Sequence, residues 1–215
     1  MKNFQEEMPG KRLRIAVLLS GSGTTLQNLL DHIRQEKLAG KIVLAVADRA
    51  GVKGLDRARD ANIPAETVLR NSCASVEDFS QRIFDLCRKA QVELVCMAGF
   101  LRLLRIPPDY TNRVMNIHPA LIPAFSGKGY HGPHVHKAVV ESGVKVTGCT
   151  VHFADNHYDH GPIILQKIVP VLDDDSAEQV AARVFEAECQ AYPEAVQLFA
   201  QGKLKVEGRR VRQLP

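Results

Sequence analysis

The sequence predicts an α/β fold, with a doubly wound, mostly parallel sheet that is extended by mixed strands. Residues 12–20 and 92–99 form nearly continuous apolar runs, which are typical of strands buried on both faces of a parallel sheet. Segments with helical spacing of apolar residues alternate with such runs over the first 100 residues, as in a Rossmann-like domain. The later sequence is richer in strands, so we expect mixed strands to extend the same sheet.

The order of the elements follows from these local patterns. We expect strands at 12–20, 41–49, 64–70, 92–99, 114–118, 145–154 and 163–171. We expect helices at 26–40, 52–62, 75–90, 134–143 and 173–202. Ser75 is expected to cap the third helix at its N-terminus, and Gly40 to close the first helix.

Three further segments are less regular. Residues 100–113 are expected to form a short helical piece that two prolines break. Residues 119–133 form a long loop rich in glycine and proline, and loops of this length in a compact domain are often functional. The tail at 203–212 alternates charged and apolar residues, which favours a terminal strand with a charged edge over a binding patch.

Length and composition fit one ordinary domain. We expect residues 1–215 to form a single domain, with a loose lead-in at 1–11, a nucleotide- or phosphate-binding half at 12–100 and a second half at 101–215. A net charge of +4 is too small and too dispersed to indicate a nucleic-acid partner, and no apolar run is long enough to cross a membrane. Five cysteines without a CxxC pair predict a reduced, cytoplasmic protein; whether it is a monomer or a homodimer is left open.

Ligands of doubly wound sheets bind at the carboxyl ends of the strands. Polar or glycine-rich residues follow most of the predicted strands, and we expect them to converge on one edge of the sheet. They are residues 20–25, Asp48, Arg70, 98–104, 116–119 and 153–159.

A glycine loop joins the first strand to the first helix. Its glycines let the backbone approach a ligand, and the helix start offers free N–H groups, so Gly23, Thr24 and Thr25 predict an anion site, typically for phosphate. A simple tight turn is the structural alternative. A dinucleotide fingerprint with Asp48 as the ribose ligand is another, but Leu26 replaces the third glycine that close strand–helix packing requires.

Asn116 and His118 lie on one face of the strand that ends at 118, because side chains alternate along a strand. Together they can donate hydrogen bonds to an oxygen that becomes negative during acyl transfer. The histidine needs an orienting carboxylate, and the loop after residue 154 offers Asp155 and Asp159. The alternative is a satisfied core histidine beside a turn-forming asparagine.

Seven of the eight histidines fall between His118 and His160, which raises the question of a metal site. The HExxH spacing of helical zinc sites is absent, and the turn at 157–160 does not match a known ligand pattern. We therefore predict no metal, and we expect His134 and His136 to cap or line the anion site.

The motifs together resemble one enzyme family over residues 12–212. The segments that carry the resemblance are AVLLSGSGTTLQNLL, AGFLRLL, NIHPALIPAF, GCTVHFADNHYDHGPIILQKIVPV and EAECQAYPEAV. They resemble the phosphoribosylglycinamide formyltransferases, folate-dependent enzymes of purine synthesis. The resemblance implies a formyltransferase-type fold and transfer of the formyl group of 10-formyltetrahydrofolate to the amine of glycinamide ribonucleotide, giving formylglycinamide ribonucleotide and tetrahydrofolate. It implies a folate co-substrate and no metal.

The resemblance also implies roles for matched residues. The catalytic residues would be Asn116, His118 and Asp159. The substrate phosphate would bind Gly23, Thr24 and Thr25. The folate would contact Leu101, Arg102, Leu103, Leu104, Asn116, Asp155, Asn156, His157, Tyr158 and Asp159. The amine and ribose end of the nucleotide would contact Phe185, Glu186, Ala187 and Glu188. In this scheme Asn116 and a protonated His118 stabilise the oxyanion, and Asp159 orients His118 and favours its cationic form.

Three rival functions remain. A formyltetrahydrofolate hydrolase resembles this sequence and shares the catalytic trio, but that family carries a further N-terminal domain, whereas about 11 residues precede the first strand here. A nucleotide-binding sensor would use the glycine loop without needing the trio. A nicotinamide enzyme would use the same loop for a dinucleotide.

Overall fold

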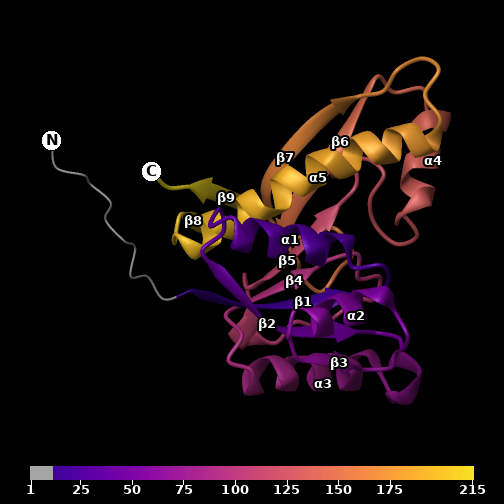
Figure 1. The fold of residues 1–215 in the computed structure, drawn as a ribbon. Helices are drawn as coiled ribbons and strands as arrows, with labels where there is room; N and C mark the ends of the chain where they lie inside the picture. The colour runs from indigo at the N-terminus through magenta and orange to yellow at the C-terminus, as the bar shows by residue number, and fades with distance from the viewer. Residues whose placement is uncertain (1–11) are drawn as a thin grey trace, which may run out of the picture.

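The computed structural model describes residues 12–215, so the predicted lead-in at 1–11 lies outside the described residues. The described chain contains nine strands in one sheet, in the order β3-β2-β1-β4-β5-β6-β7-β9-β8 (Figure 1). The strands are β1 (Leu13–Leu19), β2 (Gly40–Ala47), β3 (Ala65–Thr67), β4 (Leu94–Met97), β5 (Val114–His118), β6 (Val146–Phe153), β7 (Ile163–Pro170), β8 (Leu204–Glu207) and β9 (Arg210–Gln213). The helices are α1 (Thr24–Arg34), α2 (Lys53–Asp60), α3 (Val76–Lys89), α4 (Pro133–Glu141) and α5 (Ala177–Ala200).

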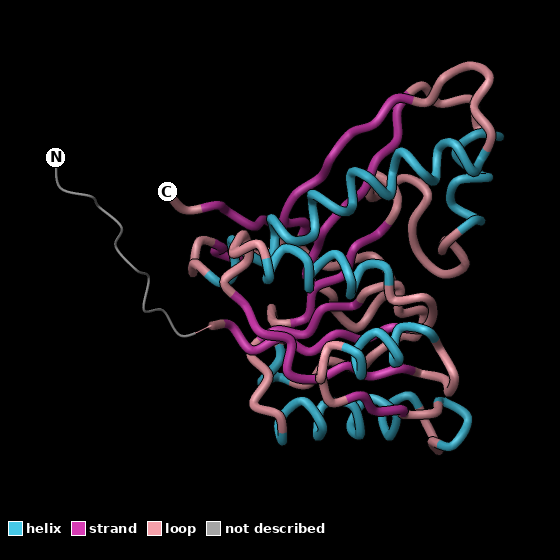
Figure 2. Tube along the Cα trace, in the orientation of Figure 1, coloured by secondary structure: helices cyan, strands magenta, loops and turns pink. Residues whose placement is uncertain are grey.

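The predicted α/β fold is confirmed. Strands β3, β2, β1, β4 and β5 are parallel, and the neighbouring pairs β5–β6 and β6–β7 are antiparallel, so mixed strands extend the parallel half as expected. The two long strands β6 and β7 project beyond the parallel half, and α5 lies along them (Figure 2).

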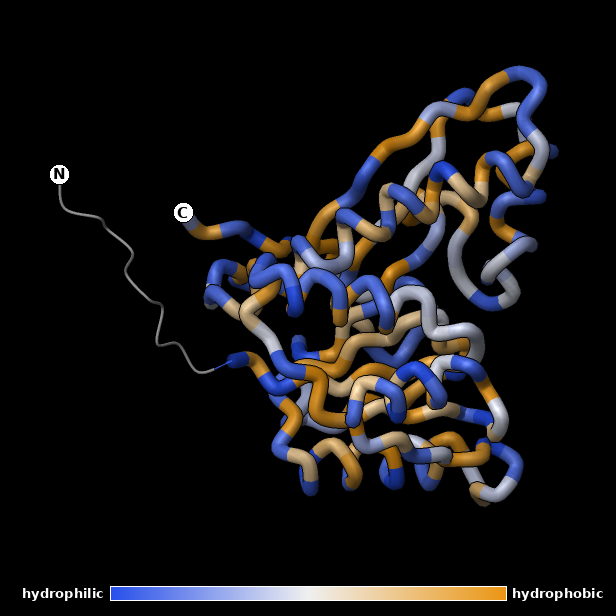
Figure 3. Tube along the Cα trace, in the orientation of Figure 1, coloured by the Kyte–Doolittle hydropathy of each residue, from blue (hydrophilic) through white to orange (hydrophobic). Residues whose placement is uncertain are grey.

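Helices cover both faces of the sheet because its strands are apolar on both faces. Ala16 and Leu18 of β1 pack with α3 on one face, whereas Ile15, Val17 and Leu19 pack with α1, α2 and α5 on the other. Helix α3 lies on the opposite side of the sheet from α1 and α5 (Figure 1). Hydrophobic residues accordingly concentrate along the central strands (Figure 3).

Helix boundaries differ in part from the predictions. Ser75 caps α3 as expected, and its side chain accepts a hydrogen bond from the Asp78 N–H at 3.1 Å. Helix α1, however, ends at Arg34, and the chain reverses through Glu36, whose φ is 57°. Gly40 is the first residue of β2 and does not close the helix.

The prediction of a helical piece at 100–113 is wrong. Residues 100–107 run without helix, and only a 3₁₀ turn at Pro108–Tyr110 follows. Residues distant in the sequence accept hydrogen bonds from backbone N–H groups of this segment, in place of the carbonyls of a helix. The Arg105 N–H, for example, donates to the Ser80 hydroxyl at 2.8 Å. The tail forms two strands, β8 and β9, where one was expected, because the chain reverses at Gly208 (φ 61°).

None of the helices within residues 12–215 has the length and apolar character needed to cross a bilayer.

Candidate active site

A cavity of about 1030 Å³ opens where the strand order reverses between β1 and β4. Such switch points separate the loops that follow neighbouring parallel strands and leave a crevice for a ligand. The cavity is lined by the loop after β1, the segment after β4, the end of β5, the loop between β6 and β7, and one side of α5. Most of the predicted site segments therefore meet in one place.

Not every residue expected at this edge of the sheet lines the cavity. Asp48 and Arg70 do not line the cavity. Asp48 is buried and accepts a hydrogen bond from Arg102 at 2.8 Å, so its role is to hold the segment after β4. Asp159 follows β6, which is antiparallel to β5. It reaches the site because the loop at 154–162 turns back across the sheet.

The proposed trio converges at the end of β5. The Asn116 Nδ2–H donates to Asp159 Oδ1 at 3.4 Å, and His118 Nδ1 lies 3.5 Å from Asp159 Oδ2. Asp159 Oδ2 also accepts the Gly127 backbone N–H at 2.9 Å. The His118 Nε2–H donates to the Phe125 carbonyl at 2.8 Å, which fixes the ring plane.

His152 is a site residue that the sequence analysis missed. It faces Asn116 in the antiparallel register of β5 and β6, and its Nε2 accepts from Asn116 Nδ2 at 3.2 Å. Its Nδ1–H donates to the Phe153 carbonyl at 2.9 Å, which leaves Nε2 as the acceptor. Asp159 Oδ1 lies 3.8 Å from the same nitrogen. His152 could have been identified only from the register between β5 and β6, and the local sequence does not reveal that register.

Burial dominates the electrostatics of His118. It lowers the pKa of His118 below the usual histidine range, and the nearby Asp159 carboxylate offsets this only in part. The lowered pKa makes the imidazole neutral at pH 7 in the free protein. Burial alone would raise the pKa of Asp159, but the neighbouring His152 and His118 rings and the hydrogen bond from the Gly127 N–H outweigh it and lower the pKa, so this carboxylate is ionised.

The glycine loop leads directly into α1. Gly23 is the N-cap residue in a left-handed conformation (φ 73°), and α1 has no side-chain cap there. A Cβ at Gly23 would lie 2.5 Å from the Gly54 Cα, so only glycine fits between α1 and α2. Thr24 and Thr25 line the cavity, as does Ser22, whereas Gly23 does not. The free N–H groups at this helix start are suited to an anion.

The segment after β4 forms another wall. Leu101, Arg102, Leu103 and Leu104 all line the cavity, and the Leu101 N–H donates to the Ser20 hydroxyl at 3.2 Å. In the facing loop the predicted folate residues Asp155, His157, Tyr158 and Asp159 also line the cavity. Asn156 does not; its side chain accepts the Ile106 N–H at 2.8 Å and joins the two walls.

Helix α5 closes the remaining side. Phe185 and Glu188 line the cavity, whereas Glu186 and Ala187 do not. Burial raises the pKa of the Glu188 carboxyl to about 7.

The long loop at 119–133 and the start of α4 also reach the cavity. His131 and His136 line it, and His134 does not. Among residues 12–215, His136 Nδ1 is one of two buried side-chain polar atoms without a hydrogen-bond partner.

Known proteins resemble this chain in sequence and structure. Residues 13–196 match the formyl transferase family. The chain belongs to this family. It is 34% identical to the phosphoribosylglycinamide formyltransferase of Haemophilus influenzae, over 90% of each chain. The structure of glycinamide ribonucleotide transformylase 1 from Symbiobacterium toebii superimposes with a TM-score of 0.89 and 43% identity, covering 99% of this chain and 100% of that one. The resemblance indicated by the motifs is thereby confirmed.

Other relatives are longer or more distant. The chain is 39% identical to the trifunctional purine biosynthetic protein adenosine-3 of Gallus gallus over 95% of its own length, but spans only 20% of that protein. A formyltetrahydrofolate deformylase from Burkholderia mallei shares the fold, with a TM-score of 0.82 at 24% identity.

Proposed function

We propose that this formyl transferase moves the formyl group of 10-formyltetrahydrofolate to the amine of glycinamide ribonucleotide, in purine synthesis. The observation that carries the proposal is the convergence of Asn116, His118 and Asp159 on one wall of the cavity. That wall lies between a helix start suited to phosphate and an apolar segment suited to a folate. Relatives named for this reaction align over nearly the whole chain.

Asn116 is the first donor for the oxyanion. When the amine attacks the formyl carbon, the formyl oxygen becomes negative. One Asn116 N–H is held by His152 at 3.2 Å, whereas the other makes only the long 3.4 Å contact with Asp159. This second N–H is the one that the oxyanion recruits. A donor of this kind contributes about 3–4 kcal/mol to transition-state stabilisation.

His118 and Asp159 act as a pair. Ionised Asp159 accepts the proton that the attacking amine loses, directly or through water, and relays it to His118 Nδ1, which lies 3.5 Å away. Negative charge forming on the nearby oxygen favours this protonation, so the imidazolium arises with the intermediate. As the oxyanion collapses and the C–N bond to the formyl carbon breaks, the same proton passes back through Asp159 to the folate nitrogen, and His118 returns to the neutral form.

The substrates occupy opposite ends of the cavity in this proposal. The nucleotide phosphate binds at the start of α1 beside Thr24 and Thr25, and its amine end approaches Glu188. The folate lies along the segment 101–104 and the loop 155–159. The co-substrate is thus 10-formyltetrahydrofolate, and the chemistry of the trio requires no metal.

The test is a deformylation assay with purified protein. The absorbance change of 10-formyl folate is followed with glycinamide ribonucleotide, without it, and with ribose 5-phosphate, which carries the phosphate but lacks the amine. The proposal predicts rapid change only when the amine-bearing nucleotide is present. Equal rates in all three mixtures would assign the chain to the hydrolases instead.

Two further expectations belong to this proposal. We treat residues 12–215 as one catalytic domain because the cavity draws its walls from both halves of the chain. All five cysteines lie within the described residues and are free thiols, which supports the cytoplasmic location predicted from the sequence.

A further inference from the structure

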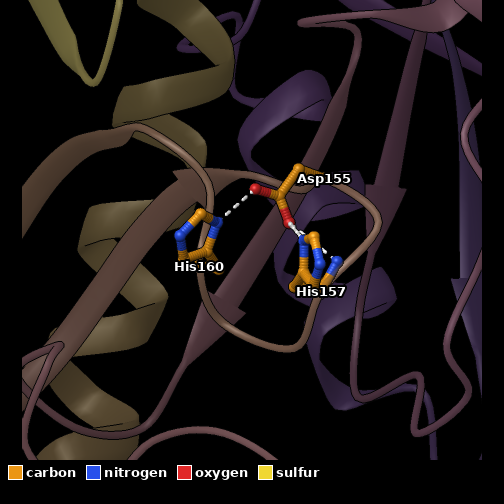
Figure 4. A group of neighbouring side chains, drawn as sticks. All are labelled: Asp155, His157 and His160. Atoms are coloured by element: carbon orange, nitrogen blue, oxygen red, sulfur yellow. Dashed lines mark hydrogen bonds and ion pairs between the residues drawn. The ribbon is translucent and has the colours of Figure 1, made fainter.

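The loop between β6 and β7 brings together three side chains that commonly bind metals. Figure 4 shows Asp155 between His157 and His160. His160 Nδ1 lies 2.6 Å from Asp155 Oδ2, and His157 Nδ1 lies 3.7 Å from Asp155 Oδ1. One ligand atom from each residue falls within 4.8 Å of the others. The chain can therefore present three donors to one point.

We propose that Asp155, His157 and His160 form a binding site for a first-row divalent metal ion of the Zn²⁺ type. Two imidazoles and one carboxylate are a ligand set that Zn²⁺ and its neighbours in the series accept, with further positions left for water. The proposal adds a site to the proposed formyl transfer and does not depend on that function, since the ion is not asked to take part in the reaction.

The distances require only small movements. Donors bound to one Zn²⁺ at about 2.0–2.1 Å lie at most about 4.2 Å apart. The side chains of His157 and His160 are 75% and 55% exposed, so both rings are able to turn by the remaining amount. Asp155 Oδ1 also accepts the His157 backbone N–H at 2.8 Å, which holds the carboxylate between the two rings.

Arg209 opposes the ion. It lies in the turn between β8 and β9 and donates to His160 Nε2 at 2.8 Å and to the His160 carbonyl at 2.9 Å. When Nδ1 of His160 binds a metal, Nε2 carries the proton, and the first of these hydrogen bonds is lost. Arg209 therefore sets the affinity of the site without being a ligand.

The position of the site gives it a consequence for the cavity. Asp159 lies between the ligands His157 and His160 in the sequence. Its backbone has a φ of 51°, a left-handed conformation that is rare for residues other than glycine, so neighbouring contacts must stabilise it. An ion joining residues 155 and 160 ties the two ends of the segment that carries Asp159. We expect this segment to become more rigid when the ion is bound.

The first test is direct binding to the full-length protein without a histidine tag. Co²⁺ is titrated and followed by its visible absorption, and Zn²⁺ is then used to displace it, both without substrates. We expect one equivalent to bind in the wild type. His160→Gln should weaken binding by roughly tenfold or more, since changes even outside the ligand shell cost about that much. Arg209→Gln should lower the Kd.

The matched control is His131→Gln. The rings of His131 and His134 are 5.4 Å apart, so this exposed pair is the obvious competing site. Unchanged affinity in His131→Gln, together with weaker binding in His160→Gln, supports the proposal. Loss of binding in His131→Gln, or equal binding in wild type and His160→Gln, overturns it.

Hydrogen–deuterium exchange locates the ion without any substitution. Zn²⁺ should slow exchange in a peptide that covers 154–162 and leave 130–136 unchanged. Slower exchange at 130–136 alone, or at neither segment, would contradict the proposal. Because no formyl donor is present in either test, this outcome is independent of whether the chain transfers formyl groups.

Discussion

Asn116 and His152 face each other across the antiparallel pair β5–β6, and the Asn116 amide donates to His152 Nε2 at 3.2 Å. His152 is fully buried and fixes the amide through this bond. Its position therefore determines which Asn116 N–H remains for the substrate.

We expect His152→Ala to lower kcat by roughly tenfold to a hundredfold and to change KM little, because a misaligned oxyanion donor loses part of its effect. His152→Gln keeps an acceptor and should recover part of the rate. Thr147→Val is the control. Thr147 lies on the same strand as His152, and its buried hydroxyl has no hydrogen-bond partner, so removing the hydroxyl should leave kcat unchanged. Equal kcat in His152→Ala and wild type would contradict a positioning role.

Asp159→Asn should keep the fold and substrate binding but lower kcat by about 10²–10⁴-fold, because the amide cannot accept the amine proton. Steady-state kinetics with both substrates give the split between kcat and KM. The control is Asp173→Asn, since Asp173 is an exposed partner of Lys145 and does not line the cavity. A near wild-type kcat in Asp159→Asn would show that the trio is wrongly assigned.

Glu188 should make stability depend on pH. Its carboxyl has a pKa of about 7 in the folded protein against 4.5 as the ordinary value, so the folded state binds more protons between these values. Stability from this group is therefore present below pH 4.5 and lost as pH rises through about 7. The loss is at most about 3 kcal/mol.

Chemical denaturation at pH 5 and pH 8 measures this effect. Glu188→Gln removes the titrating group, so the difference in unfolding free energy between the two pH values should shrink. Glu178→Gln, an exposed position on the same helix, is the control and should not shrink it. If Glu188→Gln and wild type have the same pH dependence, the carboxyl does not titrate near 7.

Gly161 should be intolerant of a side chain. A Cβ there would lie 1.8 Å from the Phe153 carbonyl oxygen, and this backbone cannot retreat without moving the loop. Gly161→Ala should cost more than about 2 kcal/mol of unfolding free energy, a size typical of forced overpacking. It should also lower kcat by displacing Asp159. Gly21→Ala meets no atom within 4 Å and serves as the stability control. Equal melting temperatures for the two variants would contradict the packing argument.

The sequence predicted the elements whose signal is local. The strands β1, β2 and β4 follow from apolar runs, and α3 from its spacing and its Ser75 cap. The segment 100–113 has apolar residues at helical spacing, but its N–H groups bind Ser80 and Asn156, which lie far away in the chain. Such partners override local propensity and leave no local sign.

The candidate site likewise contains residues that the local sequence predicts and residues that depend on tertiary structure. Asn116 and His118 share a face because side chains alternate along a strand, so the sequence alone predicts this pair. The meeting of Asp159 with both residues depends on the turn of the loop at 154–162, and His152 depends on strand register. The cluster of Asp155, His157 and His160 arises from the same loop, so spacing rules for helical metal sites could not find it.

The most direct test of the proposed reaction follows the formyl group itself. 10-Formyltetrahydrofolate labelled with ¹³C in the formyl carbon is incubated with the protein and glycinamide ribonucleotide, and ¹³C NMR identifies the product. Formyl transfer predicts a formamide carbon on the nucleotide, formed by the wild type and nearly absent with Asp159→Asn. Label that appears as free formate, whether or not the nucleotide is present, would contradict formyl transfer.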